Sequence, residues 1–421
     1  MKSLSTKLKA AALVGAMAVT ACAGAVIANA SEDVVLNFYY WDEGQTPGMD
    51  AAIALFEEQN PNIKIESTVI PWSDYFTKLQ TALPAGTGPD VFWVNIHAAQ
   101  FANAGLLLDL KDLIAEAGID ISNYPQASLD VMKFDTEDAI YGMPKDFQSV
   151  GIYYNKGIFD EMGVPYPQAD WTWEDFRETA IQLTNDDHYG YASFIGYPNF
   201  RSFEVSNGAV YTNEDKTESL LNSPESVEAL QFLHDLMYVD HASPTGAEMA
   251  EIEASDMFRN GMVAMMADGS WCKNTYYEAL GDDLAVIEMP QNAVKAIPDG
   301  GGLCYGIASN GKNIEASWTF VEFLASAEAQ IAAIPAGIPA NKEAQAVWLE
   351  QNSNVDGISY LVDCEPYCKG NPTYAYQTIG ECETYENEAM SAIFLDENAD
   401  IQSIMDDMAA KINKTIADAA K

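Results

Sequence analysis

Short polar side chains stand beside tryptophan at four places in the sequence. These places are Tyr40-Trp41-Asp42-Glu43, Trp72-Ser73-Asp74, Trp93-Val94-Asn95 and Gly269-Ser270-Trp271. A sugar ring presents apolar CH faces flanked by hydroxyl groups, so a site that binds it needs a flat aromatic surface beside hydrogen-bonding groups. A single tryptophan of this kind is more often part of a core. The recurrence at predicted strand ends favours a binding site for a neutral glycan.

Paired carboxylates offer an enzymatic alternative, because hydrolysis of a glycosidic bond uses two carboxyl groups roughly 5 to 10 Å apart. The candidates are Asp42, Glu43, Asp74, Asp146 and Glu204. With 63 acidic residues in the chain, adjacent pairs are expected by chance. The sequence contains no GxSxG, GxxxxGK[ST] or HExxH motif. We therefore expect no catalytic residue and no cofactor.

The charge of the chain is strongly negative. Its 421 residues include 21 Lys and Arg against 63 Asp and Glu, a formal net charge of -42. A content of 48% hydrophobic and 11% aromatic residues predicts folded domains, because disordered acidic chains lack such side chains. Nucleic acid is excluded as a partner, since binding to phosphates depends on cationic groups. A neutral or cationic ligand is favoured over an anionic one.

Residues 1–30 have the composition of an export signal, with three lysines before an apolar run from Ala10 to Ala28. Two cleavage points compete. Val19-Thr20-Ala21-Cys22 resembles a lipobox and predicts lipidation of Cys22, whereas Ala28-Asn29-Ala30 fits the ordinary small-x-small rule. No later segment approaches the ~18 to 20 apolar residues of a membrane span. We expect an exported protein, either a cell-surface lipoprotein or a periplasmic or extracellular protein, that meets the membrane only through a lipid anchor.

Five cysteines remain if Cys22 is lipidated, and an odd number leaves at least one thiol outside any pair within the chain. They are Cys272, Cys304, Cys364, Cys368 and Cys382. Cys364 and Cys368 could form a disulfide in a loop, with Cys382 as an alternative partner. Zinc is disfavoured, because the four histidines lie far from these cysteines in the sequence and no CxxC pair is present.

Alternating strand and helix patterns predict an α/β fold. An apolar strand over residues 34–40 precedes a helix that stops before Asn60-Pro61, and residues 63–69 alternate as a strand does. A second helix ends at Pro84, before a strand over residues 91–94. Strand, helix, strand, helix, strand is typical of a doubly wound sheet.

The pattern restarts with a buried strand at residues 151–154 and a helix capped by Thr172. Further helices are expected around residues 224–237, 318–324 and 401–416. No Pro, Ser or Gly-rich linker separates the two α/β regions. Their direct junction predicts two lobes around a cleft.

One long stretch carries a resemblance to a known family. It reads YGMPKDFQSVGIYYNKGIFDEMGVPYP, followed by WTWEDFRETAIQLT. This stretch resembles the family 1 extracellular solute-binding proteins of sugar ABC importers, the maltose-binding-protein-like group. WDEGQTPGMDAAIALFEEQNPNIKIE, YFTKLQTALPAGTGPDVFWVN, FRNGMVAMMADGSW and GGGLCYGIASNGKNIEASWTFVEFLAS match in the same order. Together they cover nearly all of the mature chain.

The resemblance implies an α/β, two-lobed type II periplasmic-binding-protein fold. Each lobe is then a doubly wound sheet with helices on both faces, and the ligand cleft lies between the lobes. Lobe 1 would comprise residues 31–145 and about 305–350, and lobe 2 residues 146–304 and about 351–421. The chain would cross between lobes three times. Lys145 and Asp146 would lie at the first crossing, which acts as a hinge.

The resemblance also implies where ligand is bound. Carried over position by position, the ligand-binding residues would be Trp41, Asp42, Asn95, Asp146, Gln148, Trp271, Gly301 and Gly302, to which we add Asp74, Phe200, Arg201 and Tyr305. The segment from Cys364 to Cys382 departs from the family pattern. Ligand contacts there are not implied.

The sequence thus predicts a monomeric receptor that captures a mono- or oligosaccharide and delivers it to an ABC permease without chemistry. Two alternatives remain. The first is a binding protein for another solute, such as a polyamine or a peptide. The second is an exported glycan hydrolase, which would release products from an oligosaccharide. The motifs do not name the sugar or the permease.

Overall fold

The computed structural model describes residues 33–134, 138–193, 195, 199–297, 301–334, 337–368, 374 and 378–419. The predicted export signal and Cys22 lie outside these residues. Across the part of the chain that is described, no helix is both long and apolar enough to cross a membrane.

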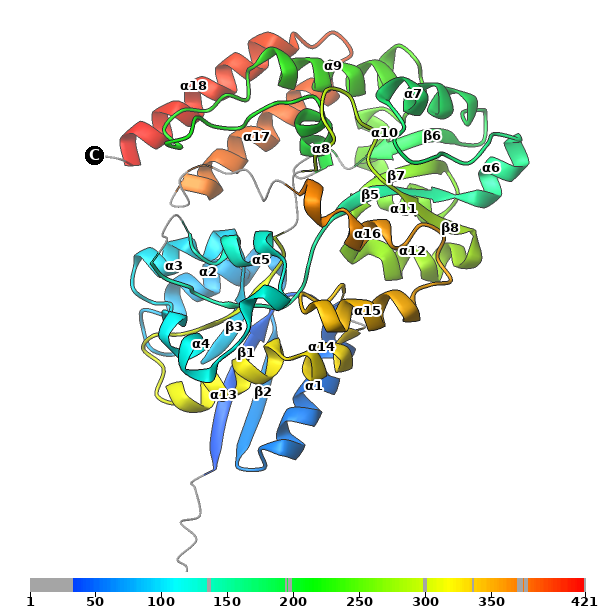
Figure 1. The fold of residues 1–421 in the computed structure, drawn as a ribbon. Helices are drawn as coiled ribbons and strands as arrows, with labels where there is room; N and C mark the ends of the chain where they lie inside the picture. The colour runs from blue at the N-terminus through cyan, green and yellow to red at the C-terminus, as the bar shows by residue number, and fades with distance from the viewer. Residues whose placement is uncertain are drawn as a thin grey trace, which may run out of the picture.

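The chain forms two lobes, each built around one sheet (Figure 1). The first lobe holds five strands in the order β2-β1-β3-β9-β4. Their bounds are Val34–Tyr40 for β1, Ile63–Val69 for β2, Val91–Val94 for β3, Met143–Pro144 for β4 and Cys304–Ile307 for β9. Strand β1 pairs in parallel with β2 and β3, whereas β9 runs antiparallel to β3 and β4. The predicted strand and helix alternation over the first three strands is confirmed.

Alternate residues of the first sheet enter two apolar cores. Phe38 and Trp93 lie in the core shared with helix α1 (Thr46–Gln59) and helix α13 (Ile314–Ala325). Phe92, next to Trp93, lies in the opposite core with helix α2 (Trp72–Ala82). Because side chains alternate between the faces of a strand, helices cover both faces of this sheet.

The second lobe holds four strands in the order β6-β7-β5-β8. Their bounds are Val150–Asn155 for β5, Tyr189–Ser193 for β6, Val263–Gly269 for β7 and Leu284–Ile287 for β8. Only β6 and β7 are parallel, since β5 runs antiparallel to both of its neighbours. This sheet therefore has more antiparallel pairing than the alternation of strands and helices suggested.

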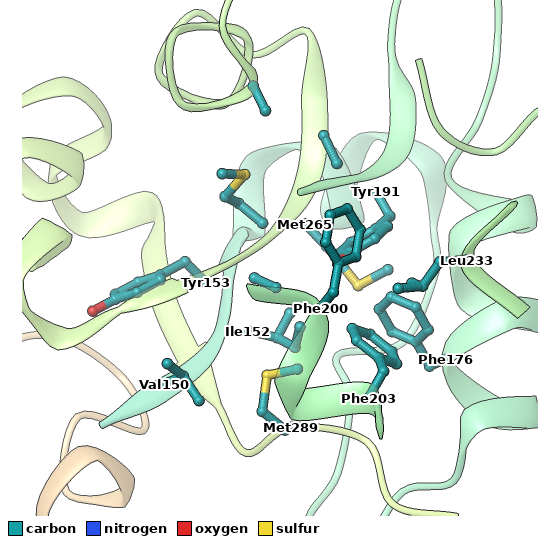
Figure 2. Packing of buried hydrophobic residues seen from close by; sticks show 14 of the residues in the cluster. Val150, Ile152, Tyr153, Phe176, Tyr191, Phe200, Phe203, Leu233, Met265 and Met289 are labelled. Carbon is teal, nitrogen blue, oxygen red and sulfur yellow. The ribbon is translucent and has the colours of Figure 1, made fainter. Parts of the chain in front are cut away.

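Local sequence signals set the helices of the second lobe. Thr172 and Asp175 form the capping box of α7 (Trp173–Gln182), at the predicted cap, and Ser223 caps α9 (Pro224–Tyr238). Phe176 of α7 points into a core that also contains Phe203 and Tyr191 (Figure 2).

Further helices complete the lobes. In the first part of the chain they are α3 (Ala99–Asn103), α4 (Lys111–Ala117), α5 (Gln126–Val131), α6 (Lys156–Met162), α8 (Asn199–Ser206), α10 (Gly246–Glu251), α11 (Ala254–Arg259) and α12 (Lys273–Leu280). The later ones are α14 (Ala327–Ala332), α15 (Lys342–Gln351), α16 (Tyr360–Asp363), α17 (Ile379–Phe394) and α18 (Ile401–Ala419). Helices α17 and α18 pack on the second lobe (Figure 1).

None of the five described cysteines is in a disulfide, so the bridge considered from the sequence among Cys364, Cys368 and Cys382 is not formed. The sulfur of Cys364 bonds to the carbonyl of Leu361 at 3.6 Å, and that of Cys368 to the carbonyl of Cys364 at 3.5 Å. These thiols are thus turned toward the backbone of their own segment, while Cys382 is buried in α17. Among the described residues, no cluster of three or more His, Cys, Asp or Glu could hold a metal ion.

A buried polar network joins α8 to α17. Arg201 donates to Glu386 at 3.1 Å, and Tyr374 donates to the other oxygen of Glu386 at 2.5 Å. Tyr211 donates to Glu204 at 2.6 Å. Burial raises the pKa of Glu204 to about 7, although the hydrogen bond from Tyr211 and the charge of Arg201 oppose this shift.

Glu204→Gln is expected to remove a pH dependence of the free energy of unfolding. Because the folded-state pKa of Glu204 is raised from 4.5 to about 7, its stabilising contribution is complete below about pH 4.5 and is lost as pH rises through 7. The loss is on the order of 3 kcal/mol. Chemical denaturation at pH 5 and pH 8 should show the wild type losing more stability than the variant. Glu218→Gln, at an exposed site, is the control. Equal losses in wild type and Glu204→Gln would contradict the assignment.

Candidate functional site

Three segments that link the lobes lie side by side and bond to one another. The backbone amide of Lys145 donates to the carbonyl of Leu303 at 2.8 Å, and that of Phe147 to Ile338 at 2.9 Å. Ala340 donates to the carbonyl of Lys145 at 3.3 Å. The first of these segments, at Lys145, is where the resemblance puts the first crossing. The lobe bounds of 31–145 with about 305–350, and of 146–304 with about 351–421, stay a prediction.

A buried ion pair stands at this hinge. The Nζ atom of Lys145 lies 2.8 Å from Oδ2 of Asp146, and the residues are 4% and 5% exposed. Oδ1 of Asp146 accepts from the amide of Leu303 at 2.7 Å. Lys145 also donates to Gln45 at 2.7 Å and lies 4.4 Å from the ring centroid of Trp93. The pair therefore connects the first lobe to the second crossing.

A cavity of about 510 Å³ opens beside the hinge, within the usual size of a small-molecule site. On the first lobe it is lined by Trp41, Asp42, Gln45, Trp72, Asn95, Ile96, His97 and Val131. On the hinge and the second lobe it is lined by Gln148, Trp271, Gly301, Gly302, Leu303, Glu383 and Asn387. Both lobes thus contribute to one cavity.

Seven predicted site residues meet in this cavity, namely Trp41, Asp42, Asn95, Gln148, Trp271, Gly301 and Gly302. Asp42 follows β1 and Asn95 follows β3, and the carboxyl ends of parallel strands lie at the same edge of a sheet. That convergence explains why residues 53 positions apart share one site. The two strand ends were readable from the sequence.

The polar residues after these strands also shape their own loops. Oδ1 of Asp42 accepts from the amide of Gly44 at 2.9 Å, and Oδ2 accepts from the side chain of Gln45 at 2.8 Å. Asn95 accepts from the amide of His97 at 3.0 Å. Each of these side chains caps a 3-10 turn, Glu43–Gln45 or Ile96–Ala98, at the wall of the cavity.

Three tryptophans supply the apolar surface of the cavity. Trp41 meets Trp72 edge-on with ring centroids 5.1 Å apart, and Trp72 is 47% exposed. Trp271, from the second lobe, is 38% exposed. Its indole lies against Gly269, where a Cβ atom would overlap the ring. Large aromatic faces are therefore accessible on both sides of the cavity.

Two predicted site residues of the first lobe lie outside the cavity. Asp74 is exposed in the first turn of α2. Tyr305 is 1% exposed within β9, with its hydroxyl 3.9 Å from the sulfur of Met49. Asp146 lies at the hinge. Its carboxylate pairs with Lys145 and accepts a hydrogen bond from the backbone amide of Leu303. We therefore assign Asp74 to the surface, Tyr305 to the core and Asp146 to the hinge.

Phe200 and Arg201 also lie away from the cavity, inside the second lobe. Phe200 stacks on Phe394 with ring centroids 4.5 Å apart and points into the core (Figure 2). Arg201 is 4% exposed and paired with Glu386. Helix α8 turns both side chains inward, which the sequence pattern around them did not reveal.

Sequence reasoning missed several cavity residues. Trp72 carried a signal, since it stands in one of the four tryptophan clusters, but it was not selected. Gln45 and His97 lie in turns just beyond the selected Asp42 and Asn95. Glu383 and Asn387 are four residues apart on α17, directly after the segment that departs from the family pattern. No motif pointed to them.

A cavity between two α/β lobes, joined by three crossing segments, defines a two-lobed ligand-binding protein. The sequence model of the bacterial extracellular solute-binding proteins matches residues 41–331, and the chain belongs to that family. The resemblance stated from the sequence and the expected fold class are both confirmed. The family name implies an exported protein that binds a solute.

Relatives support the same classification. A putative binding protein of Brucella abortus is 24% identical over 372 residues, which are 85% of this chain and 86% of the relative. The galactooligosaccharide-binding protein of Bacillus subtilis is 23% identical over 68% of this chain and 67% of its own. An ABC substrate-binding protein of Listeria monocytogenes, solved in complex with cycloalternan, is 29% identical with a TM-score of 0.84. That likeness covers 92% of this chain and all of the solved chain.

Gly302→Ala is expected to destabilise the hinge. Gly302 has φ of 97°, and a Cβ atom there would overlap the carbonyl oxygen of Asp146. Gly208→Ala is a matched control, because Gly208 has φ of 88° but its nearest neighbouring atom would be 4.0 Å from the new Cβ. Both changes carry the backbone penalty of about 1 to 2 kcal/mol, and only the first adds a collision. Chemical denaturation that shows equal losses would rule out the close approach.

Proposed function

We propose that this protein is a receptor that captures an oligosaccharide between its lobes and delivers it to an ABC permease. The observation that carries the proposal is the placement of Trp41, Trp72 and Trp271 around one cavity with amide and carboxylate groups between them. Rings stack on the CH faces of a sugar while the polar groups bond its hydroxyls. The names of the Bacillus and Listeria relatives, with their oligosaccharide ligands, support the same ligand class.

The charge of the cavity favours a neutral sugar over a phosphorylated or acidic one. Asp42 and Glu383 line it, and its described lining residues include neither Lys nor Arg. An anionic ligand would meet two carboxylates with only His97 as a potential counter-charge. The net charge of -42 acts in the same direction at long range.

A cationic solute such as a polyamine is the weaker alternative. It would need carboxylates available to it, but Asp42 already accepts from Gln45 and Glu383 bonds to His97. A hydrolase is weaker still, since Asp74, Asp146 and Glu204 lie outside the cavity lining. Of the carboxylates considered from the sequence, only Asp42 lines the site. Solute binding is also the role named by the family description.

Delivery to a permease and attachment at Cys22 complete the proposal. A soluble receptor near the membrane needs retention at the cell surface, and one lipidated residue would supply it. The alternative cleavage after Ala30 would release the same receptor without an anchor. We propose that the receptor acts as a monomer, since the cavity is built from one chain.

The test is a thermal-shift screen of the mature protein against neutral mono- and oligosaccharides, with polyamines and short peptides alongside. A ligand that binds only the native state stabilises it by about 2.7 kcal/mol at a hundredfold excess over its dissociation constant. We expect a shift with an oligosaccharide that is recovered intact. Shifts with polyamines or peptides alone would overturn the sugar assignment, and a cleaved sugar would overturn the binding role.

Trp271→Ala is expected to raise the dissociation constant for the bound oligosaccharide at least about tenfold, or about 1.4 kcal/mol, by removing a stacking surface. The fold should persist, because the side chain is 38% exposed. Trp271→Phe, which keeps an aromatic face, should recover part of the affinity. Isothermal titration calorimetry measures both variants. Unchanged affinity in Trp271→Ala would remove this residue from the site.

A further inference from the structure

Helix α17 belongs to the second lobe but reaches the first. Its first residue, Ile379, is 2% exposed and lies in the same apolar cluster as Tyr75 and Phe92 of the first lobe. One turn further, Oε2 of Glu383 lies 2.8 Å from Nε2 of His97, which precedes α3. Residues four apart share one face of a helix, so a single face of α17 makes an apolar and a polar contact with the opposite lobe.

The same face of α17, further along the helix, is anchored in the second lobe. Glu386 bonds to Arg201 and Tyr374, and all three side chains are buried. Met390 and Phe394 pack in the core of the same lobe. A helix attached in this way cannot shift on its own lobe without breaking a buried ion pair, which is costly. Its contacts with the first lobe are therefore coupled to the movement of the whole second lobe.

The first lobe holds His97 equally firmly. Its ring packs edge-on to Trp72 and tilted against Phe76, with ring centroids 5.4 Å away in each case. The backbone amide of His97 donates to Oδ1 of Asn95 at 3.0 Å. Since an ionised carboxylate only accepts hydrogen bonds, Nε2 is the donor to Glu383. The bond thus joins two side chains that are each fixed by their own lobe.

We propose that α17 is a clasp, in which Ile379 and the His97–Glu383 bond hold the lobes together across the cleft through protein contacts alone. Such contacts favour the closed arrangement before a ligand arrives. A larger fraction of the ligand-free protein is then already closed. Because the apparent affinity rises with that fraction, a ligand that binds the closed arrangement binds more tightly. The inference rests on the proposed function only in taking the cavity between the lobes as the ligand site.

The clasp predicts how the shape of the ligand-free protein changes on mutation. Ile379→Ala removes the apolar contact and lies outside the cavity lining, whereas Glu383→Ala removes the bond to His97. Small-angle X-ray scattering of each ligand-free variant should show a larger radius of gyration than the wild type. Glu388→Gln is the matched control on the same helix, because its side chain is 58% exposed and faces Lys411. It should scatter like the wild type.

Unchanged scattering in both variants, with circular dichroism and melting showing that they are folded, would overturn the clasp. His97→Asn and the double variant His97→Asn with Glu383→Ala give an independent check. If the two side chains act through one bond, the double variant expands no more than either single one, whereas additive expansion would contradict the bond.

Binding kinetics separate this inference from the proposed function. With an oligosaccharide found in the screen, Ile379→Ala should raise the dissociation constant about fivefold through faster release, although Ile379 is not a lining residue of the cavity. Expansion of the variants in a protein that binds no sugar would support the clasp and defeat the sugar assignment. If the wild type and the variants bind the sugar with the same release rate and scatter identically, the sugar assignment is supported and the clasp is overturned.

Discussion

The buried pair of Lys145 and Asp146 is the interaction on which the arrangement of the lobes depends. Two charges removed from water are stable only when their remaining hydrogen-bonding capacity is used. Here Gln45 of the first lobe takes one bond from Lys145, and the amide of Leu303 gives one to Asp146. The pair is therefore satisfied only when the first crossing, the second crossing and the first lobe are correctly positioned relative to one another. The backbone of Gly302 is drawn against Asp146 by the same requirement.

A series of hydrogen bonds connects this hinge to the cavity. Asp42 lines the cavity and accepts from Gln45, and Gln45 in turn accepts from Lys145. A change at the cavity wall is thus two hydrogen bonds away from the ion pair of the hinge. The clasp of α17 is also at the cavity wall, because His97 and Glu383 are both lining residues. The ligand site thus borders both the hinge and a contact between the lobes.

The strong negative charge is distributed so that it does not prevent folding. Lys145 and Arg201 neutralise carboxylates inside the protein, where an unpaired charge would cost most. Glu204 lies close to Arg201, but Arg201 is paired with Glu386. The pKa of Glu204 is raised because Glu204 is buried. The acidic chain therefore places two of its few cations, Lys145 and Arg201, at buried positions, whereas the cavity-lining residues that the structure describes include neither Lys nor Arg.

The sequence by itself determined the elements and half of the site. Periodicity and caps are local, so the strands β1 to β3, the Thr172 cap and the polar residues after β1 and β3 were readable from neighbouring residues. The resemblance added the family and the crossings. Only the tertiary structure decided that Phe200 and Arg201 face a core, that the described cysteines form no disulfide, and that Glu383 reaches His97 across 286 positions. Those outcomes depend on which distant side chains meet when the lobes close, and no local pattern carries that information.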